Sequence, residues 1–93
     1  MRIALVQVAA TTDPAANLEI VRTRAAQAAS LGAELVVFPE ATMCSFARPR
    51  ADAAEPFDGP WASGVREIAA ELGVTIVVGM FTTTDGPRVR NTL

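Results

Sequence analysis

Glu40 is the residue in this sequence whose type and position most directly suggest chemistry. It follows an apolar run, Leu35–Phe38, and a proline. We expect that run to be a strand buried on both faces, and open α/β sheets bind ligands in the crevice beyond the carboxyl ends of their strands. A carboxylate at such a place can act as a general base, with its proton affinity tuned by partial burial. The alternative is a surface acid in a loop, and position in a fold does not by itself decide between the two.

Cys44 lies four residues after Glu40 and invites a second hypothesis, that of a nucleophile. The sequence contains no histidine that could activate a thiol. A reactive cysteine also needs an electropositive environment, whereas a lone cysteine in an apolar context is usually a small space-filling residue. We therefore predict a structural role for Cys44. Trp61 and Phe38 are likewise predicted to belong to the core, and Asn91 to be a hydrogen-bonded structural residue.

The elements that would position Glu40 follow from a pattern that occurs twice in the sequence. Segments 31–37 and 72–78 each read as a helix end, a glycine and an apolar strand. A further strand, mostly buried, is predicted over Ile3–Ala9. The order is then β-α-β-α-β, which predicts buried, mostly parallel strands in an α/β fold. Asp85-Gly86 predicts a closing hairpin between Met80–Thr82 and a segment that starts at Arg88.

Helix boundaries are signalled by local chemistry. Asp13 and Pro14 have the types expected at an N-cap and a first helical position, which predicts a helix from Pro14 to about Leu31. Asp58-Gly59-Pro60 begins a second helix, and Gly73 ends it. Residues 41–59, between Glu40 and this second helix, show no helical or strand periodicity. We interpret them as a long loop that forms the rim of a site.

Composition limits the class of protein. The chain of 93 residues fits one domain, and its 51% hydrophobic content excludes disorder. The net charge is −2 and the eight basic residues are scattered arginines, so nucleic acid and anionic membranes are poor candidate partners. No run approaches the roughly 20 apolar residues of a membrane helix. With one cysteine and no histidine, a disulfide framework and a His/Cys metal site are excluded, and a reducing, cytoplasmic setting fits best.

The block Gly32-Ala33-Glu34-Leu35-Val36-Val37-Phe38-Pro39-Glu40 strongly resembles the first conserved block of the nitrilase superfamily, the carbon-nitrogen hydrolases. Further matches are Ile3–Gln7, Asn17, Gly59-Pro60, Gly73, Gly79 and Asn91-Thr92. Ser45-Phe46 stands where the family often has a Gly-Tyr pair, so Phe46 is a candidate substrate-binding residue in the pocket wall.

The resemblance implies an αββα sandwich and a Glu-Lys-Cys triad that hydrolyses a small amide or nitrile without a metal or cofactor. Only Glu40 of the triad can be carried over. The family's lysine and nucleophile lie further along, so residues 1–93 are expected to be an incomplete, N-terminal portion of the domain, inactive alone. Nitrile, primary amide, carbamoyl and acyl-transfer chemistries stay open, with an amidase favoured. The full-length protein is expected to form a homo-oligomer. The alternative is a short, non-catalytic α/β interaction module.

Overall fold

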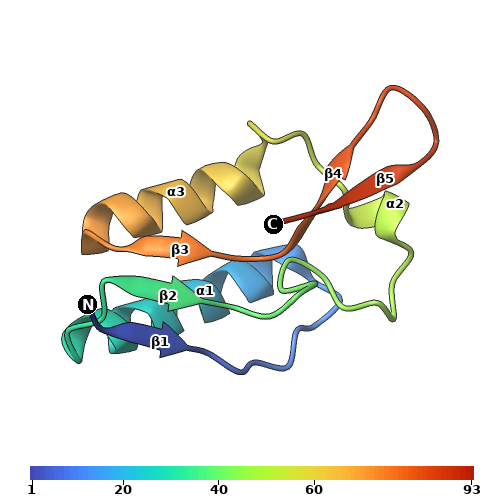
Figure 1. Cartoon of the computed structure of the whole chain (residues 1–93). Coiled ribbons are helices and arrows are strands. Elements are labelled where there is room, and N and C mark those ends of the chain that lie inside the picture. Colours follow the sequence, from blue (N-terminus) through green and yellow to red (C-terminus); the bar gives the residue numbers. More distant parts are fainter.

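The computed structural model describes residues 1–93 and contains a parallel, three-stranded sheet (Figure 1). Its strands are β1 (Ile3–Leu5), β2 (Leu35–Val37) and β3 (Thr75–Val77), in the order β1-β2-β3. The central strand β2 pairs in parallel with both neighbours. The predicted β-α-β-α-β order with parallel strands is confirmed.

Helix α1 (Pro14–Ser30) begins and ends as its sequence predicts. The Asp13 carboxylate accepts a hydrogen bond from the Ala15 N–H and Pro14 occupies the first turn, where a missing N–H has no cost. Gly32 follows the helix with φ 88°, a left-handed conformation that suits glycine. This turn brings the chain directly into β2.

Helix α3 (Pro60–Leu72) is the second predicted helix. Gly59 is its N-cap residue, and the Glu55 carboxylate accepts a hydrogen bond from the Trp61 N–H in the first turn. Gly73 ends the helix with φ 66°. Glu55 thus supplies the capping oxygen that the sequence motif at residues 58–60 lacks.

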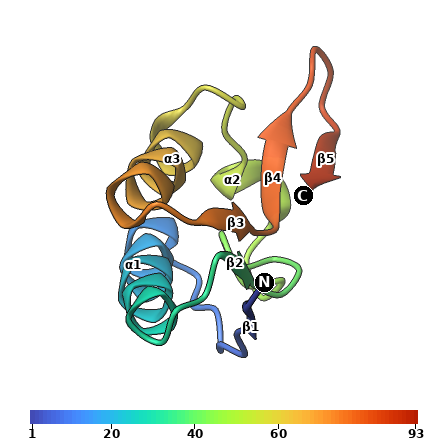
Figure 2. The ribbon, with the colours of Figure 1, turned by 60° about the vertical axis from the view of Figure 1, so that its left-hand side comes forward.

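Both long helices lie on the same face of the sheet (Figure 2). One core cluster joins the two helices to the sheet. It includes Val21 and Ala25 from α1, Val65 and Ile68 from α3, and Val36 from β2. Trp61 and Phe38, each 3% exposed, belong to the same cluster, which confirms their predicted core role. None of the helices combines the length and hydropathy that crossing a membrane requires.

The opposite face of the sheet has no covering layer within these residues. Ile3 is 53% and Leu5 is 79% exposed, and Leu35 and Val37 are only half-buried. The prediction that these strands are buried on both faces is therefore wrong for this chain. An apolar run indicates a strand that suits burial on both faces, but it does not specify which elements pack on each face. The first strand is also shorter than predicted, ending at Leu5 instead of Ala9.

The interval 41–59, predicted as a loop, contains a short helix α2 (Arg50–Ala53) and an isolated bridge between Glu55 and Thr82. Four residues make little more than one turn, which is too short for a helical repeat to be visible in the sequence. The bridge fastens this interval to the hairpin that follows β3.

That hairpin comprises β4 (Met80–Thr83) and β5 (Val89–Thr92), which pair antiparallel as a separate two-stranded sheet. The predicted hairpin is confirmed. Phe81 of β4 is buried together with Ala41, Cys44 and Ala53, so a second small core joins the hairpin to the segment after Glu40.

Candidate active site

Strand β2 delivers Glu40 to the carboxyl end of the parallel sheet, as predicted. Pairing continues beyond the strand, since the Phe38 N–H donates to the Val77 carbonyl at 2.8 Å. The chain then turns sharply: the Thr42 hydroxyl donates to the Pro39 carbonyl at 2.6 Å, and Ala41 has φ 59°. A left-handed alanine costs of order 1 to 2 kcal/mol, and such strain is held only where surrounding contacts fix the backbone.

A buried asparagine supplies part of that fixation. Asn17, 1% exposed, donates from its side-chain amide to the carbonyls of Thr11 and Met43, each at 2.9 Å. Its Oδ1 accepts from the backbone N–H and the hydroxyl of Thr11, each at 2.8 Å. Asn17 therefore ties the start of α1 to the segment that follows Glu40.

Gly79, between β3 and β4, allows a close approach of two backbones. A Cβ placed on Gly79 would lie 2.8 Å from the Ala41 nitrogen and 3.0 Å from the Glu40 Cα. The Gly79 carbonyl also accepts a hydrogen bond from the Met43 N–H at 3.1 Å. The lack of a side chain at residue 79 lets β4 lie against the backbone of Glu40.

The Glu40 carboxylate meets the hairpin. The side-chain amide of Asn91 on β5 donates a hydrogen bond to Glu40 Oε1 at 2.5 Å. Glu40, Gly79, Asn91, Thr92 and Leu93 line a hollow of about 420 Å³. Neither of the two ion pairs in the chain, Arg22 with Glu19 and with Glu71, involves Glu40. The side chain is exposed here, not partly buried as predicted.

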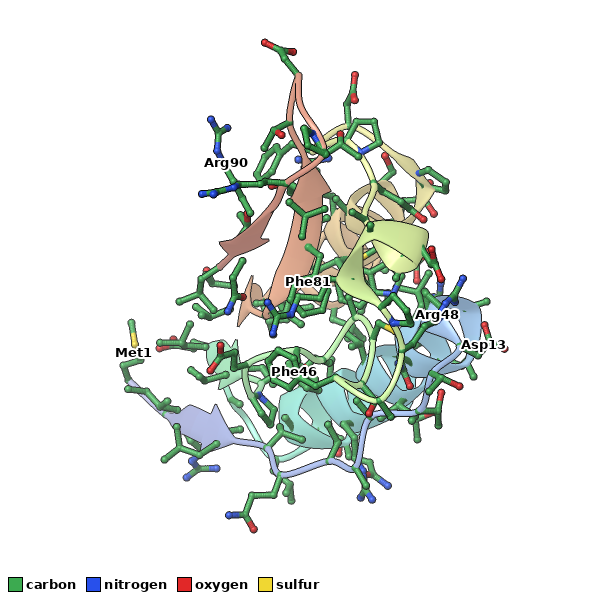
Figure 3. The ribbon with its side chains drawn as sticks, turned by 90° about the vertical axis from the view of Figure 1, so that its right-hand side faces the viewer. Met1, Asp13, Phe46, Arg48, Phe81 and Arg90 are labelled. Carbon is green, nitrogen blue, oxygen red and sulfur yellow. The ribbon has the colours of Figure 1, made fainter.

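Phe46, the other predicted site residue, lies in a different hollow. That hollow is lined by Phe46, Arg48, Pro49, Arg50, Ala51, Arg88 and Val89. The Phe46 ring is 53% exposed, packs edge-on against Phe81 with 5.8 Å between centroids, and lies under the Arg50 guanidinium at 5.2 Å. Figure 3 shows the two phenylalanine rings beside each other between the hairpin and the turn after β2. Within these residues Phe46 and Glu40 do not share a hollow.

Cys44 has the structural role predicted for it. It is fully buried among Ala41, Ala53 and Phe81, and its thiol contacts the carbonyls of Thr12 and Ser45 at 3.6 and 3.5 Å. Asn91 is hydrogen-bonded as predicted, but sequence reasoning missed that its partner is Glu40. No local motif indicates that partner, because the contact depends on where the hairpin docks.

Comparison with known sequences finds a match to the carbon-nitrogen hydrolase family over residues 2–93. Two proteins of Mycobacterium tuberculosis, from strains CDC 1551 and H37Rv and each named a hydrolase, are 60% identical over the whole of this chain. The chain spans 33% of the length of these curated relatives.

Solved structures agree with the sequence match. An amidase from Nesterenkonia sp. superposes with TM-score 0.71 at 32% identity, covering 95% of this chain and 33% of its own. A protein of the carbon-nitrogen hydrolase superfamily from Xanthomonas campestris gives TM-score 0.72 at 26% identity, with 98% and 39% covered. The Nesterenkonia enzyme is described as a member of the nitrilase superfamily. With its mixed α/β architecture and the match over nearly every residue, this chain belongs to the carbon-nitrogen hydrolase family.

Proposed function

We propose that the full-length protein hydrolyses the carbon-nitrogen bond of a small amide and that Glu40 is its general base. The observation that carries the proposal is the placement of the Glu40 carboxylate at the end of β2, in a hollow, in a chain of this family. Glu40 forms no ion pair within residues 1–93. A general base must lie within hydrogen-bonding reach of the proton that it takes, and an exposed carboxylate beside a hollow is accessible in this way.

In the proposed reaction Glu40 takes the proton of a cysteine thiol, and the thiolate attacks the amide carbonyl carbon. The amine leaves with a proton, and water then hydrolyses the thioester to a carboxylate and the free thiol. A base-activated nucleophile divides one difficult step into two easier ones, and a lysine would stabilise the developing charge.

The nucleophile and the lysine are proposed to come from beyond Leu93. Cys44 is fully buried and lies in the small core under the hairpin, so it has no access to a substrate. The sequence 1–93 contains no lysine. We accordingly expect this portion to be inactive alone.

The Nesterenkonia amidase supports the choice of substrate class. A variant of it with a glutamate changed to glutamine was solved with acrylamide added at the active-site cysteine. Another variant of that amidase was solved with butyramide. A small aliphatic amide is therefore the substrate class we favour here, and Phe46 is proposed to form part of the pocket wall once later segments are in place.

Two further parts of the proposal concern the setting of the protein. The single free cysteine suits a reducing, cytoplasmic compartment. The full-length protein is proposed to form a homo-oligomer, which sedimentation of the purified protein would test.

The test of the reaction is direct. The full-length protein would be incubated with butyramide, butyronitrile and N-carbamoyl-β-alanine, and the release of ammonia would be followed for each. The proposal expects turnover of the amide, with a cysteine and a lysine encoded beyond Leu93. A reading frame without these two residues, or no turnover of any amide, would contradict it.

One observation favours a second candidate, a non-catalytic interaction module. The uncovered face of the sheet presents Ile3 and Leu5, an apolar surface of the kind that partners bind. Residues 1–93 would be expressed and examined by size-exclusion chromatography and thermal unfolding. A soluble monomer that unfolds cooperatively would favour the module, whereas aggregation is expected if residues 1–93 need the rest of an enzyme to cover that face.

A further inference from the structure

Asn91 is the one side chain that hydrogen-bonds to the Glu40 carboxylate, and it is 51 positions away in the sequence. A carboxylate on a flexible side chain samples several rotamers unless a partner selects one. A neutral amide that donates to one oxygen selects an orientation without adding a positive charge. An arginine or lysine at the same place would also orient the carboxylate, but would make it a weaker base.

Asn91 lies on β5, which pairs with β4, and β4 itself is held along both of its edges. On β4, Phe81 pairs with Asn91, and the hydroxyls of Thr82 and Thr92 are 2.8 Å apart and share a hydrogen bond. The other edge of β4 is fixed by Glu55, whose N–H donates to the Phe81 carbonyl and whose carbonyl accepts from the Thr83 N–H, each at 3.1 Å. Strand β4 is thus hydrogen-bonded along both edges, and β5, which carries Asn91, pairs with this fixed strand.

Glu40 is held equally firmly at its backbone, by the turn at Ala41 and the close approach of Gly79. With the backbone fixed, the rotamer of the Glu40 side chain is what can still vary in this part of the site. Asn91 removes that freedom by binding Oε1, and it leaves Oε2 available.

We propose that Asn91 is a positioning residue for Glu40: its amide holds Oε1 so that Oε2 faces the proton to be taken. This inference rests on the proposed role of Glu40 as the base. It also gives the hairpin a role in the site, because β4 and β5 are the elements that bring Asn91 to Glu40.

The test uses the full-length protein with butyramide as substrate. Asn91→Ala is expected to lower kcat by about 10- to 100-fold with KM changed by less than about threefold, since a hydrogen bond to a charged group is lost near the reacting atoms. Asn91→Asp keeps the shape but places a second carboxylate beside Glu40, the only titratable side chain among those lining the hollow. Like charges disfavour ionisation, so the acidic limb of the kcat/KM profile is expected to move to higher pH by about one unit or more.

Two control variants separate positioning from support of the hairpin. Thr82→Val removes the hydroxyl pair with Thr92 and weakens the same hairpin without touching Glu40. Arg90→Ala changes the residue that precedes Asn91. The Arg90 side chain points away from the body of the molecule (Figure 3). Both are expected to leave the acidic limb where it is in the unaltered protein.

Crystal structures of the full-length protein and of Asn91→Ala add a readout that does not depend on activity. The unaltered protein is expected to keep Asn91 Nδ2 within hydrogen-bonding distance of Glu40, and the variant to show the carboxylate in another rotamer or in several. An unmoved carboxylate in Asn91→Ala, or equal kinetics in Asn91→Ala and Thr82→Val, would overturn the positioning role. Near-normal turnover in Glu40→Gln would instead contradict the proposed function itself.

Discussion

Gly79→Ala should disturb Glu40 through the backbone, with no loss of any side-chain contact. The added Cβ would lie 2.8 Å from the Ala41 nitrogen, 3.0 Å from the Glu40 Cα and 3.2 Å from its carbonyl carbon. Ordinary contact begins near 3.4 Å, so the two segments must separate by roughly 0.6 Å. The opposing atoms belong to the backbone and cannot rotate away as a flexible side chain can.

The cost of that separation follows from packing energetics. Overpacking of this kind typically destabilises a protein by about 1 to 3 kcal/mol. A displacement of 1 Å at a reacting group can reduce activity by about 100-fold, so a shift of this size predicts a loss of about tenfold or more in kcat. Both effects should appear together, because the same movement causes them.

The assay compares Gly79→Ala with Gly86→Ala in the full-length protein. A Cβ at Gly86 meets no atom within 4 Å, and Gly86 does not have a positive φ. Urea unfolding would measure stability, and ammonia release from butyramide would measure turnover. If Gly79→Ala matched Gly86→Ala in both measurements, the close approach between β4 and Glu40 would not position the site.

Two other substitutions test the framework in urea unfolding of the full-length protein. Asn17→Ala removes the amide that joins Thr11 to Met43 and leaves the carbonyl of the buried Met43 without this partner, which should cost about 1 to 3 kcal/mol. A change below about 0.5 kcal/mol would show that water replaces these bonds. Ile68→Ala empties a fully buried core position and should cost about 2 to 5 kcal/mol, against less than about 0.5 kcal/mol for Leu31→Ala, which is 70% exposed. Equal losses at Ile68 and Leu31 would contradict the assigned core.

The features that the sequence predicts well are those that local chemistry determines. Asp13 and Pro14 begin α1, and Gly73 ends α3, because capping depends on residues next to one another. The place of Glu40 at a strand end was predictable for a similar reason, since the strand and the acid are adjacent. The hairpin could be predicted because the turn signal Asp85-Gly86 stands between two short segments that suit strands.

The features that it does not predict depend on contacts between distant residues. One face of the sheet is exposed because no layer packs on it within these residues. The types of Ile3 and Leu5 do not determine whether such a layer is present. The hydrogen bond from Asn91 to Glu40 depends on where the hairpin docks, which no local motif specifies. The separation of Phe46 from the Glu40 hollow likewise follows from the path of residues 41–59, where the periodic pattern is absent.

The central claim, that Glu40 is the base of a carbon-nitrogen hydrolase, is tested most directly by the kcat of Glu40→Gln in the full-length protein. Glu34→Gln, the same exchange at an exposed glutamate before β2, is the matched control. The account predicts a loss of about 10² to 10⁴-fold or more in Glu40→Gln, with folding and the control unaffected. Turnover within a few-fold of the control would contradict it.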